Sequence, residues 1–132
     1  MLYGVQAQGP RFTKLLLTGK SGQTYEFTWH HRGEPFEAHI KKGIAAVYAV
    51  THYDSSPSDV ANHKVIYVGE SHDVHNRFEQ HQQPTEDHRP KWEGFLKHRA
   101  NCILIHRETS RAVRKTIEQE LRLQYDPPCN RE

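Results

Sequence analysis

The fold is decided by the stretch VIYVGES at residues 65–71. Its first four residues are β-branched or aromatic, and Gly69 ends the apolar run, which predicts a short buried strand followed by a turn. The next residues predict a helix near 73–82, because Val74 and Phe78 are four residues apart and share its buried side. Strand, turn and helix therefore follow one another without a linker.

Arg77 and His81 have the same spacing of four residues on this predicted helix. Side chains at positions i and i+4 are neighbours on a helix surface, so a permanent cation and a titratable imidazole stand together. They follow directly after the strand that carries Tyr67. This arrangement suits the binding of a phosphate group.

The length of 132 residues predicts one domain with a single modest core. Charged residues are plentiful and the mean hydropathy is -0.89, which favours a soluble protein. The longest apolar runs, at 15–17 and 44–50, are far shorter than a membrane span, and the N-terminus lacks the basic-then-apolar order of a signal peptide. We therefore expect a cytoplasmic protein with no membrane partner.

The remaining apolar runs predict an α+β fold. Two β-type runs, at 12–17 and 24–29, predict an antiparallel hairpin within residues 1–42, which extends or covers the sheet of the same domain. The core, residues 43–132, is expected to be a small, mainly antiparallel three-stranded sheet flanked by helices. Its expected strands lie near 44–51, 64–68 and 101–106, and its helices near 73–82, 91–98 and 110–125.

Positive charge is concentrated between residues 88 and 115. This segment has eight Lys or Arg against two Glu, a local charge of +6 in a chain whose net charge is +2. Such asymmetry is typical of a phosphate-facing surface and predicts DNA as the partner. Two solvated helices with basic faces are the alternative interpretation.

Two further patterns are incomplete as ligand motifs. Gly19-Lys20-Ser21 looks like the end of a P-loop, but that motif requires a glycine five residues earlier, where Lys14 stands. Cys102 and Cys129 lack the paired spacing of a zinc site or a disulfide framework, so both are expected to be free thiols.

Five elements in order resemble the GIY-YIG nuclease superfamily, which includes intron-homing endonucleases, the excision-repair nuclease and some restriction enzymes. They are Ala46-Val47-Tyr48, then Tyr67-Val68-Gly69, then Arg77 ten residues after Tyr67, then a glutamate-bearing helix, and finally Pro127-Pro128-Cys129-Asn130. The resemblance covers residues 43–130. It implies a metal-dependent endonuclease that hydrolyses DNA phosphodiester bonds.

The resemblance also implies the site residues. Tyr48 and Tyr67 are the active-site phenols, and Arg77 faces the scissile phosphate. Glu118, twelve residues before Asn130, matches the ligand of one Mg²⁺ or Mn²⁺ ion, and Asn130 steadies the site. The implied catalytic set is Tyr48, Tyr67, Arg77, His81, Glu118 and Asn130.

The chain departs from the family pattern at two positions. Ala46 replaces the glycine of the first triplet, which is a small change. Glu70 follows Gly69 directly, where some members have a lysine close to the phosphate, so a like charge would face the substrate. Glu70 therefore favours an alternative function, a non-catalytic nucleic-acid-binding module on the same fold.

The requirements of phosphodiester hydrolysis explain why these residue types would occur together in one site. The reaction needs a base for the attacking water and positive charge on the developing phosphate. A phenol has an ordinary pKa of about 10, so it acts as a base only beside cations or a metal ion. Arg77 and one divalent ion on a single carboxylate supply that field. Taken alone, Tyr48 and Tyr67 would be sheet tyrosines with satisfied hydroxyls.

Two glutamates of the last helix compete for the metal. Helical periodicity places Glu120 within the apolar stripe of Val113, Ile117 and Gln124, and Glu118 at its edge. The family register selects Glu118, and an edge position leaves room for water on the ion. We therefore assign the metal to Glu118 and expect Glu120 to be a structural ion-pair member, for example with a nearby arginine.

Overall fold

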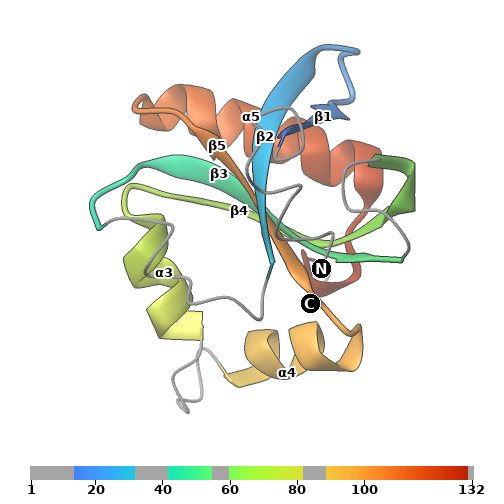
Figure 1. Cartoon of the computed structure of the whole chain (residues 1–132). Helices are drawn as coiled ribbons and strands as arrows, with labels where there is room; N and C mark the ends of the chain where they lie inside the picture. The colour runs from blue at the N-terminus through green and yellow to red at the C-terminus, as the bar shows by residue number, and fades with distance from the viewer. Residues whose placement is uncertain (1–13, 32–41, 55–59, 82–88, 131–132) are drawn as a thin grey trace.

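The sheet has five antiparallel strands and is strongly curled (Figure 1). The computed structural model describes residues 14–31, 42–54, 60–81 and 89–130. The strand order is β1-β2-β5-β3-β4, so β1 and β4 are the edge strands of the described sheet. The strands are β1 (Lys14–Thr18), β2 (Thr24–His31), β3 (Ala46–Tyr53), β4 (His63–Ser71) and β5 (Cys102–Arg107).

The predicted three-stranded sheet is wrong, because the hairpin joins the sheet as two full strands. β2 pairs with β5 in an antiparallel register that places Thr28 opposite Ile105. Buried and exposed side chains alternate along the hairpin strands, as the sequence pattern indicates. Leu17 and Phe27 are buried, while Leu16 is 54% exposed. The sequence does not show which strand β2 pairs with, because the paired residues Thr28 and Ile105 are 77 residues apart. Local periodicity specifies a face of a strand but not the neighbour that it pairs with.

Three α-helices of the described chain cover the two faces of the sheet (Figure 1). α5 (Arg111–Tyr125) packs on one face, in a core that contains residues of all five strands. α3 (Val74–His81) and α4 (Arg89–Lys97) pack on the other face, together with the short C-terminal turn η3 (Pro128–Asn130). A second short turn, η2 (Val60–Asn62), precedes β4. None of the described helices is both long and apolar enough to cross a membrane.

The buried side of α5 differs from the predicted stripe. It is formed by Arg114, Ile117 and Leu121, whereas Val113 is 42% exposed. Ser110 caps the helix by accepting a hydrogen bond from the backbone N–H of Val113. The buried arginine is the unexpected member, and its partner lies on β4.

A β-bulge in β4 decides which side chains face α3 and α4. Tyr67 and Val65 pair with successive residues of β3, so Ile66 is an extra residue without its own partner. Ile66 and Tyr67 both face the side of α3 and α4, together with Tyr48, while Val65 and Val68 face α5. The two tyrosines share a side because Tyr48 pairs with Gly69 and Val50 with Tyr67 in an unbroken register, and the bulge adds Ile66 to that side.

Candidate active site at the β4 edge

Asn130, on η3, fastens the C-terminal turn to the edge strand β4. Its Oδ1 accepts a hydrogen bond from the backbone N–H of Val68 at 2.7 Å, and its Nδ2 donates to the carbonyl of Val68 at 2.9 Å. The side chain thus satisfies both backbone groups of Val68, as a neighbouring strand would. Asn130 is a positioning residue, because it holds the segment of β4 that carries Tyr67 and Gly69.

Tyr48 and Tyr67 lie next to each other on the side of α3 and α4. Their ring centroids are 6.0 Å apart, and the ring of Tyr48 also packs edge-on against Phe78 of α3, with centroids 5.0 Å apart. Tyr48 is completely buried and Tyr67 is partly exposed. Gly69 makes room for Tyr48, since a Cβ at this position would lie 2.5 Å from the Tyr48 hydroxyl. Tyr67 is therefore the phenol that a ligand meets, and Tyr48 lies behind it.

Both phenols keep their protons more firmly than free tyrosine does. Burial raises the pKa of Tyr48 well above its ordinary value. Burial also raises the pKa of Tyr67, although the hydrogen bond that Tyr67 accepts from Tyr48 and the charge of Arg77 partly oppose this effect. At neutral pH, Tyr67 is therefore a neutral donor, and it becomes a base only when more positive charge arrives.

Arg77 and Glu118 approach the phenols from helices on opposite faces of the sheet. The charge of Arg77, on α3, lowers the pKa of both phenols and of Glu118. The side chain of Glu118, on α5, is 16% exposed. Burial raises the pKa of Glu118 above its ordinary value, against the opposing charges of Lys115 and Arg122. The structure thus brings together four of the predicted site residues, Tyr48, Tyr67, Arg77 and Glu118.

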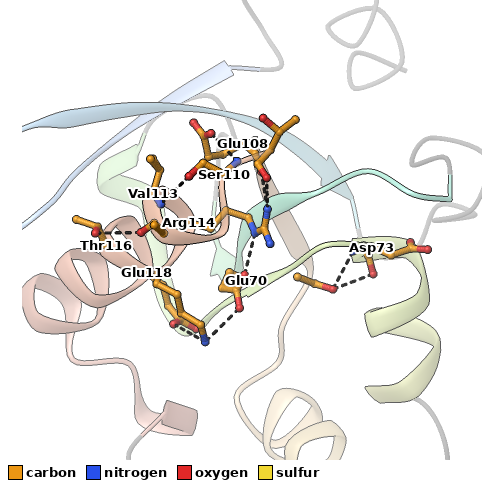
Figure 2. A network of polar contacts seen from close by, with 12 residues as sticks. Glu70, Asp73, Glu108, Ser110, Val113, Arg114, Thr116 and Glu118 are labelled. Atoms are coloured by element: carbon orange, nitrogen blue, oxygen red, sulfur yellow. Dashed lines mark hydrogen bonds and ion pairs between the residues drawn. The ribbon is translucent and has the colours of Figure 1, made fainter.

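Glu70 does not leave an uncompensated negative charge beside the site. Arg114 reaches from α5 and donates from Nε to Glu70 Oε1 at 2.8 Å, and Lys115 Nζ lies 3.2 Å from Oε2 (Figure 2). Arg114 is itself held by the backbone carbonyls of Glu108 and Thr109, at 3.0 and 2.9 Å. Burial acts to raise the pKa of Glu70, but the two cations outweigh burial and the pKa is lowered. The repulsion expected at Glu70 is therefore offset by α5.

An open hollow of about 450 Å³ lies beside Glu118. Lys115 and Arg122 stand on either side of Glu118 along α5, and all three line the hollow. Arg122 Nη2 lies 3.5 Å from the carbonyl oxygen of Asn130, which also lines it. Positive charge exceeds negative charge around the hollow and the phenols, since two carboxylates, Glu70 and Glu118, face four cations, Arg77, Arg114, Lys115 and Arg122. An anionic ligand is therefore favoured.

A divalent ion at this site would be held by Glu118, with water and phosphate oxygens completing its shell. Glu118 is the more available carboxylate, because its ion pair with Lys115 is long, at 4.0 Å, while Glu70 is held by Arg114 at 2.8 Å. Within the described ranges, no group of three or more His, Cys, Asp or Glu is placed to hold a metal. The donor set fits Mg²⁺ or Mn²⁺ with retained waters rather than a cage made only of protein ligands.

Glu120 belongs to the opposite edge of the sheet. It accepts hydrogen bonds from the hydroxyl and backbone N–H of Ser21 and, at 2.9 Å, from the hydroxyl of Tyr25. The hydrogen bonds from Ser21 and Tyr25 lower the pKa of Glu120. Its partners in the described chain are therefore hydroxyls of the hairpin rather than the arginine that we expected, because the turn between β1 and β2 lies against α5.

The predictions about His81 and about the basic segment 88–115 involve some side chains that lie outside the described residues. α3 ends at His81, whose side chain lies outside the described residues, as do those of Arg89 and Lys91 in the basic segment. Lys97 and Arg111 are exposed, but they belong to α4 and α5, which pack on opposite faces of the sheet. The described part of the basic segment is therefore divided between the two sides of the molecule.

Sequence reasoning missed Arg122 and the partner of Glu70. Arg122 follows Glu118 at the i, i+4 spacing that makes helix residues neighbours, so this signal was present. Glu70 and Arg114 are 44 residues apart, and no sequence pattern joins them. The clamp of Asn130 on Val68 spans 62 residues and had no signal either.

No protein-family model, curated protein or solved structure matches this chain. The resemblance to GIY-YIG nucleases therefore stays a prediction from five short sequence elements.

Proposed function

We propose that this protein is a metal-dependent endonuclease that hydrolyses DNA phosphodiester bonds at the β4 edge, as the GIY-YIG resemblance implies. The proposal is carried by the two adjacent phenols, Tyr48 and Tyr67, whose ring centroids are 6.0 Å apart and on which the charges of Arg77 and Glu118 act. A partly exposed phenol, a guanidinium, and a largely buried carboxylate that lines an open hollow are the groups that this hydrolysis needs.

Each group has one role in the proposed reaction. Arg77 stabilises the negative charge that develops on the phosphate oxygens. Tyr48 holds Tyr67 through their hydrogen bond, and the Tyr67 oxygen orients the attacking water. The water oxygen would form a bond to phosphorus as the bond to the leaving strand's oxygen breaks. The proton of the attacking water would pass to the ionised Tyr67 oxygen, and the leaving oxygen would take a proton from solvent. A divalent ion held by Glu118 would supply the further positive charge that lowers the pKa of Tyr67.

The raised pKa of Tyr67 favours a second candidate function, a non-catalytic nucleic-acid-binding module. If both phenols stay protonated when nucleic acid binds, neither of them takes the proton of an attacking water. The cations around the hollow then hold a phosphate backbone without breaking it. The two functions share the same surface and differ in whether the strand is cleaved.

Supercoiled plasmid separates the two functions. The endonuclease should nick or linearise it only with Mg²⁺ or Mn²⁺, and faster as the pH is raised from neutral, because more Tyr67 loses its proton. Tyr67→Phe should abolish cleavage. The control Tyr125→Phe, which removes a hydroxyl that accepts from Thr18 N at 3.2 Å, should retain it.

Plasmid that stays intact with every metal, while DNA is still shifted in a gel, identifies the binding module. The affinity in that gel assay should fall steeply with salt, because each phosphate contact releases counterions. A logarithm of affinity that does not change with the logarithm of salt concentration would exclude nucleic acid as the partner.

A further inference from the structure

Lys115 lies between the two carboxylates of the site. Its Nζ is 3.2 Å from Glu70 Oε2 and 4.0 Å from Glu118 Oε1. The side chains of Glu70 and Glu118 are 11% and 16% exposed, whereas that of Lys115 is 52% exposed. An exposed, flexible ammonium group therefore lies between two carboxylates that are largely removed from water.

We propose that the ammonium group of Lys115 is the resident counter-ion of Glu118 and competes with the divalent ion for this carboxylate. The inference rests on the proposed function, because that function places a divalent ion at Glu118. Metal binding is then an exchange, in which the ion takes the place of Lys115 beside Glu118 and the ammonium group keeps Glu70 as its partner.

The two cations next to Glu70 differ in their freedom to move. Arg114 is 4% exposed, and its guanidinium group is fixed by Glu70 and by the carbonyls of Glu108 and Thr109. Lys115 carries its charge at the end of a flexible stem, and the two carboxylates are its ion-pair partners in the described chain. Arg114 therefore stays in place during the exchange, and Lys115 is the cation that moves.

The exchange follows from the burial of Glu118. A largely desolvated carboxylate needs a cation close to it, which either a lysine or a divalent ion provides. The ion pair at 4.0 Å is long, so an ion that contacts the carboxylate directly replaces it readily. Lys115 thus keeps the charge balanced without metal, at the cost of weaker metal binding.

Mn²⁺ binding to the full-length protein without DNA, measured by isothermal titration calorimetry, tests this exchange independently of activity. Lys115→Met should bind Mn²⁺ about two- to fivefold more tightly than the wild type, the range expected for loss of one exposed ion pair. Lys115→Arg, which keeps the charge, should not gain affinity.

Lys14→Met is the matched control. Lys14 is 46% exposed and pairs with Glu26 at 3.3 Å, on the hairpin at the opposite edge of the sheet, so its loss changes the net charge equally. Its Mn²⁺ affinity should equal that of the wild type. An equal gain in Lys14→Met and Lys115→Met would overturn the inference, because net charge alone would then explain the gain.

Glu118→Gln separates the failure of this inference from the failure of the proposed function. Loss of Mn²⁺ binding in Glu118→Gln, with unchanged affinity in Lys115→Met, overturns the role of Lys115 and leaves the metal at Glu118. Wild-type affinity in Glu118→Gln, or no Mn²⁺ binding by any of these proteins, overturns both.

Discussion

Glu118 and Glu120 stand two positions apart on α5, yet they serve opposite edges of the same sheet. Glu118 faces the β4 edge, where its ion pair with Lys115 is 4.0 Å long and burial raises its pKa. Glu120 faces the turn of the hairpin, where hydrogen bonds from Ser21 and Tyr25 lower its pKa. The charged form of glutamate is thus disfavoured at the β4 edge, where Glu118 lies, and favoured at the hairpin edge, where Glu120 lies.

The difference shows that the partner groups, and not the helix position, decide what a carboxylate does. Three donors satisfy Glu120 and tie the hairpin to α5. Glu118 lines an open hollow, its ion pair with Lys115 is long at 4.0 Å, and burial raises its pKa. At one edge the carboxylate is fixed by hydrogen bonds, and at the other it lies beside open space with one long ion pair.

The largest expected effect is on cleavage, and it distinguishes the two glutamates. Glu118→Gln should reduce metal-dependent cleavage by about 100-fold or more, because the ligand of the ion is lost. Since burial raises the pKa of Glu118, its charged form is disfavoured in the folded protein, so the melting temperature should stay or rise. Glu120→Gln should keep cleavage and lower the melting temperature. Plasmid nicking and thermal denaturation of both variants measure this, and the reverse pattern would move the metal to the hairpin edge.

Arg77→Ala should reduce cleavage by a similar factor of about 100 or more, because the charge of Arg77 acts on both phenols and on Glu118. Arg77→Lys should restore it only in part, since a single ammonium group cannot replace the planar guanidinium. Nicking assays at saturating Mg²⁺ measure both variants. Cleavage by Arg77→Ala at the wild-type rate would exclude this arginine from the reaction.

Two glycines, one at each edge, should differ in the cost of an added methyl group. At Gly69 the new Cβ would lie 2.5 Å from the hydroxyl of the fully buried Tyr48, so Gly69→Ala should lose about 3 kcal/mol of unfolding free energy, as for an overpacked core. At Gly19 the new Cβ would lie 2.6 Å from Glu120 Oε1, at the end of a side chain that can turn away, and 2.9 Å from Glu120 Cβ, which moves only with α5. Gly19→Ala should therefore lose less, because only one of its two closest contacts is with a rigid group, whereas at Gly69 both are with the side chain of Tyr48. Urea denaturation of both variants tests this, and equal losses would mean that the ring of Tyr48 is free to move.

Two asparagine clamps allow a test of a smaller effect. Asn130→Ala leaves both backbone groups of Val68 without their partner and should cost about 1–2 kcal/mol of unfolding free energy. Asn101 makes the same pair of bonds to Tyr53, at 3.0 and 3.1 Å, so Asn101→Ala should cost a similar amount. Only Asn130→Ala should also lower cleavage, because only this clamp holds the strand segment of Tyr67. Equal cleavage by the two variants would make Asn130 purely structural.

The smallest effect is the acid dependence of stability. The raised pKa of Glu118 penalises the folded state at neutral pH, and this penalty is relieved as the pH falls through that pKa, above the ordinary value of 4.5. The lowered pKa of Glu120 contributes stability that is lost as the pH falls through that pKa, below the ordinary value of 4.5. Glu120→Gln should therefore flatten the acid limb of a stability profile from urea denaturation. A limb as steep as that of the wild type would show that Glu120 does not control it.

The sequence determined the local elements of this protein, because their causes act over a few residues. β-branched runs indicated β3, β4 and β5, and the buried pair Val74 and Phe78 indicated α3. Ser110 caps α5 through a hydrogen bond from Val113, three residues away. Tyr48 and Tyr67 were correctly placed in strands, since their burial depends on neighbours in the same run.

Only the tertiary structure decided how these elements join and which charges they share. The pairing of β2 with β5 turned a predicted three-stranded sheet into a five-stranded one. The pairing of Val50 with Tyr67 set the face of Tyr67, and the packing of α5 brought Arg114 to Glu70. Each of these contacts joins residues that are distant in sequence, and each depends on how much surface two whole elements bury together. The periodicity of a short segment does not contain this information.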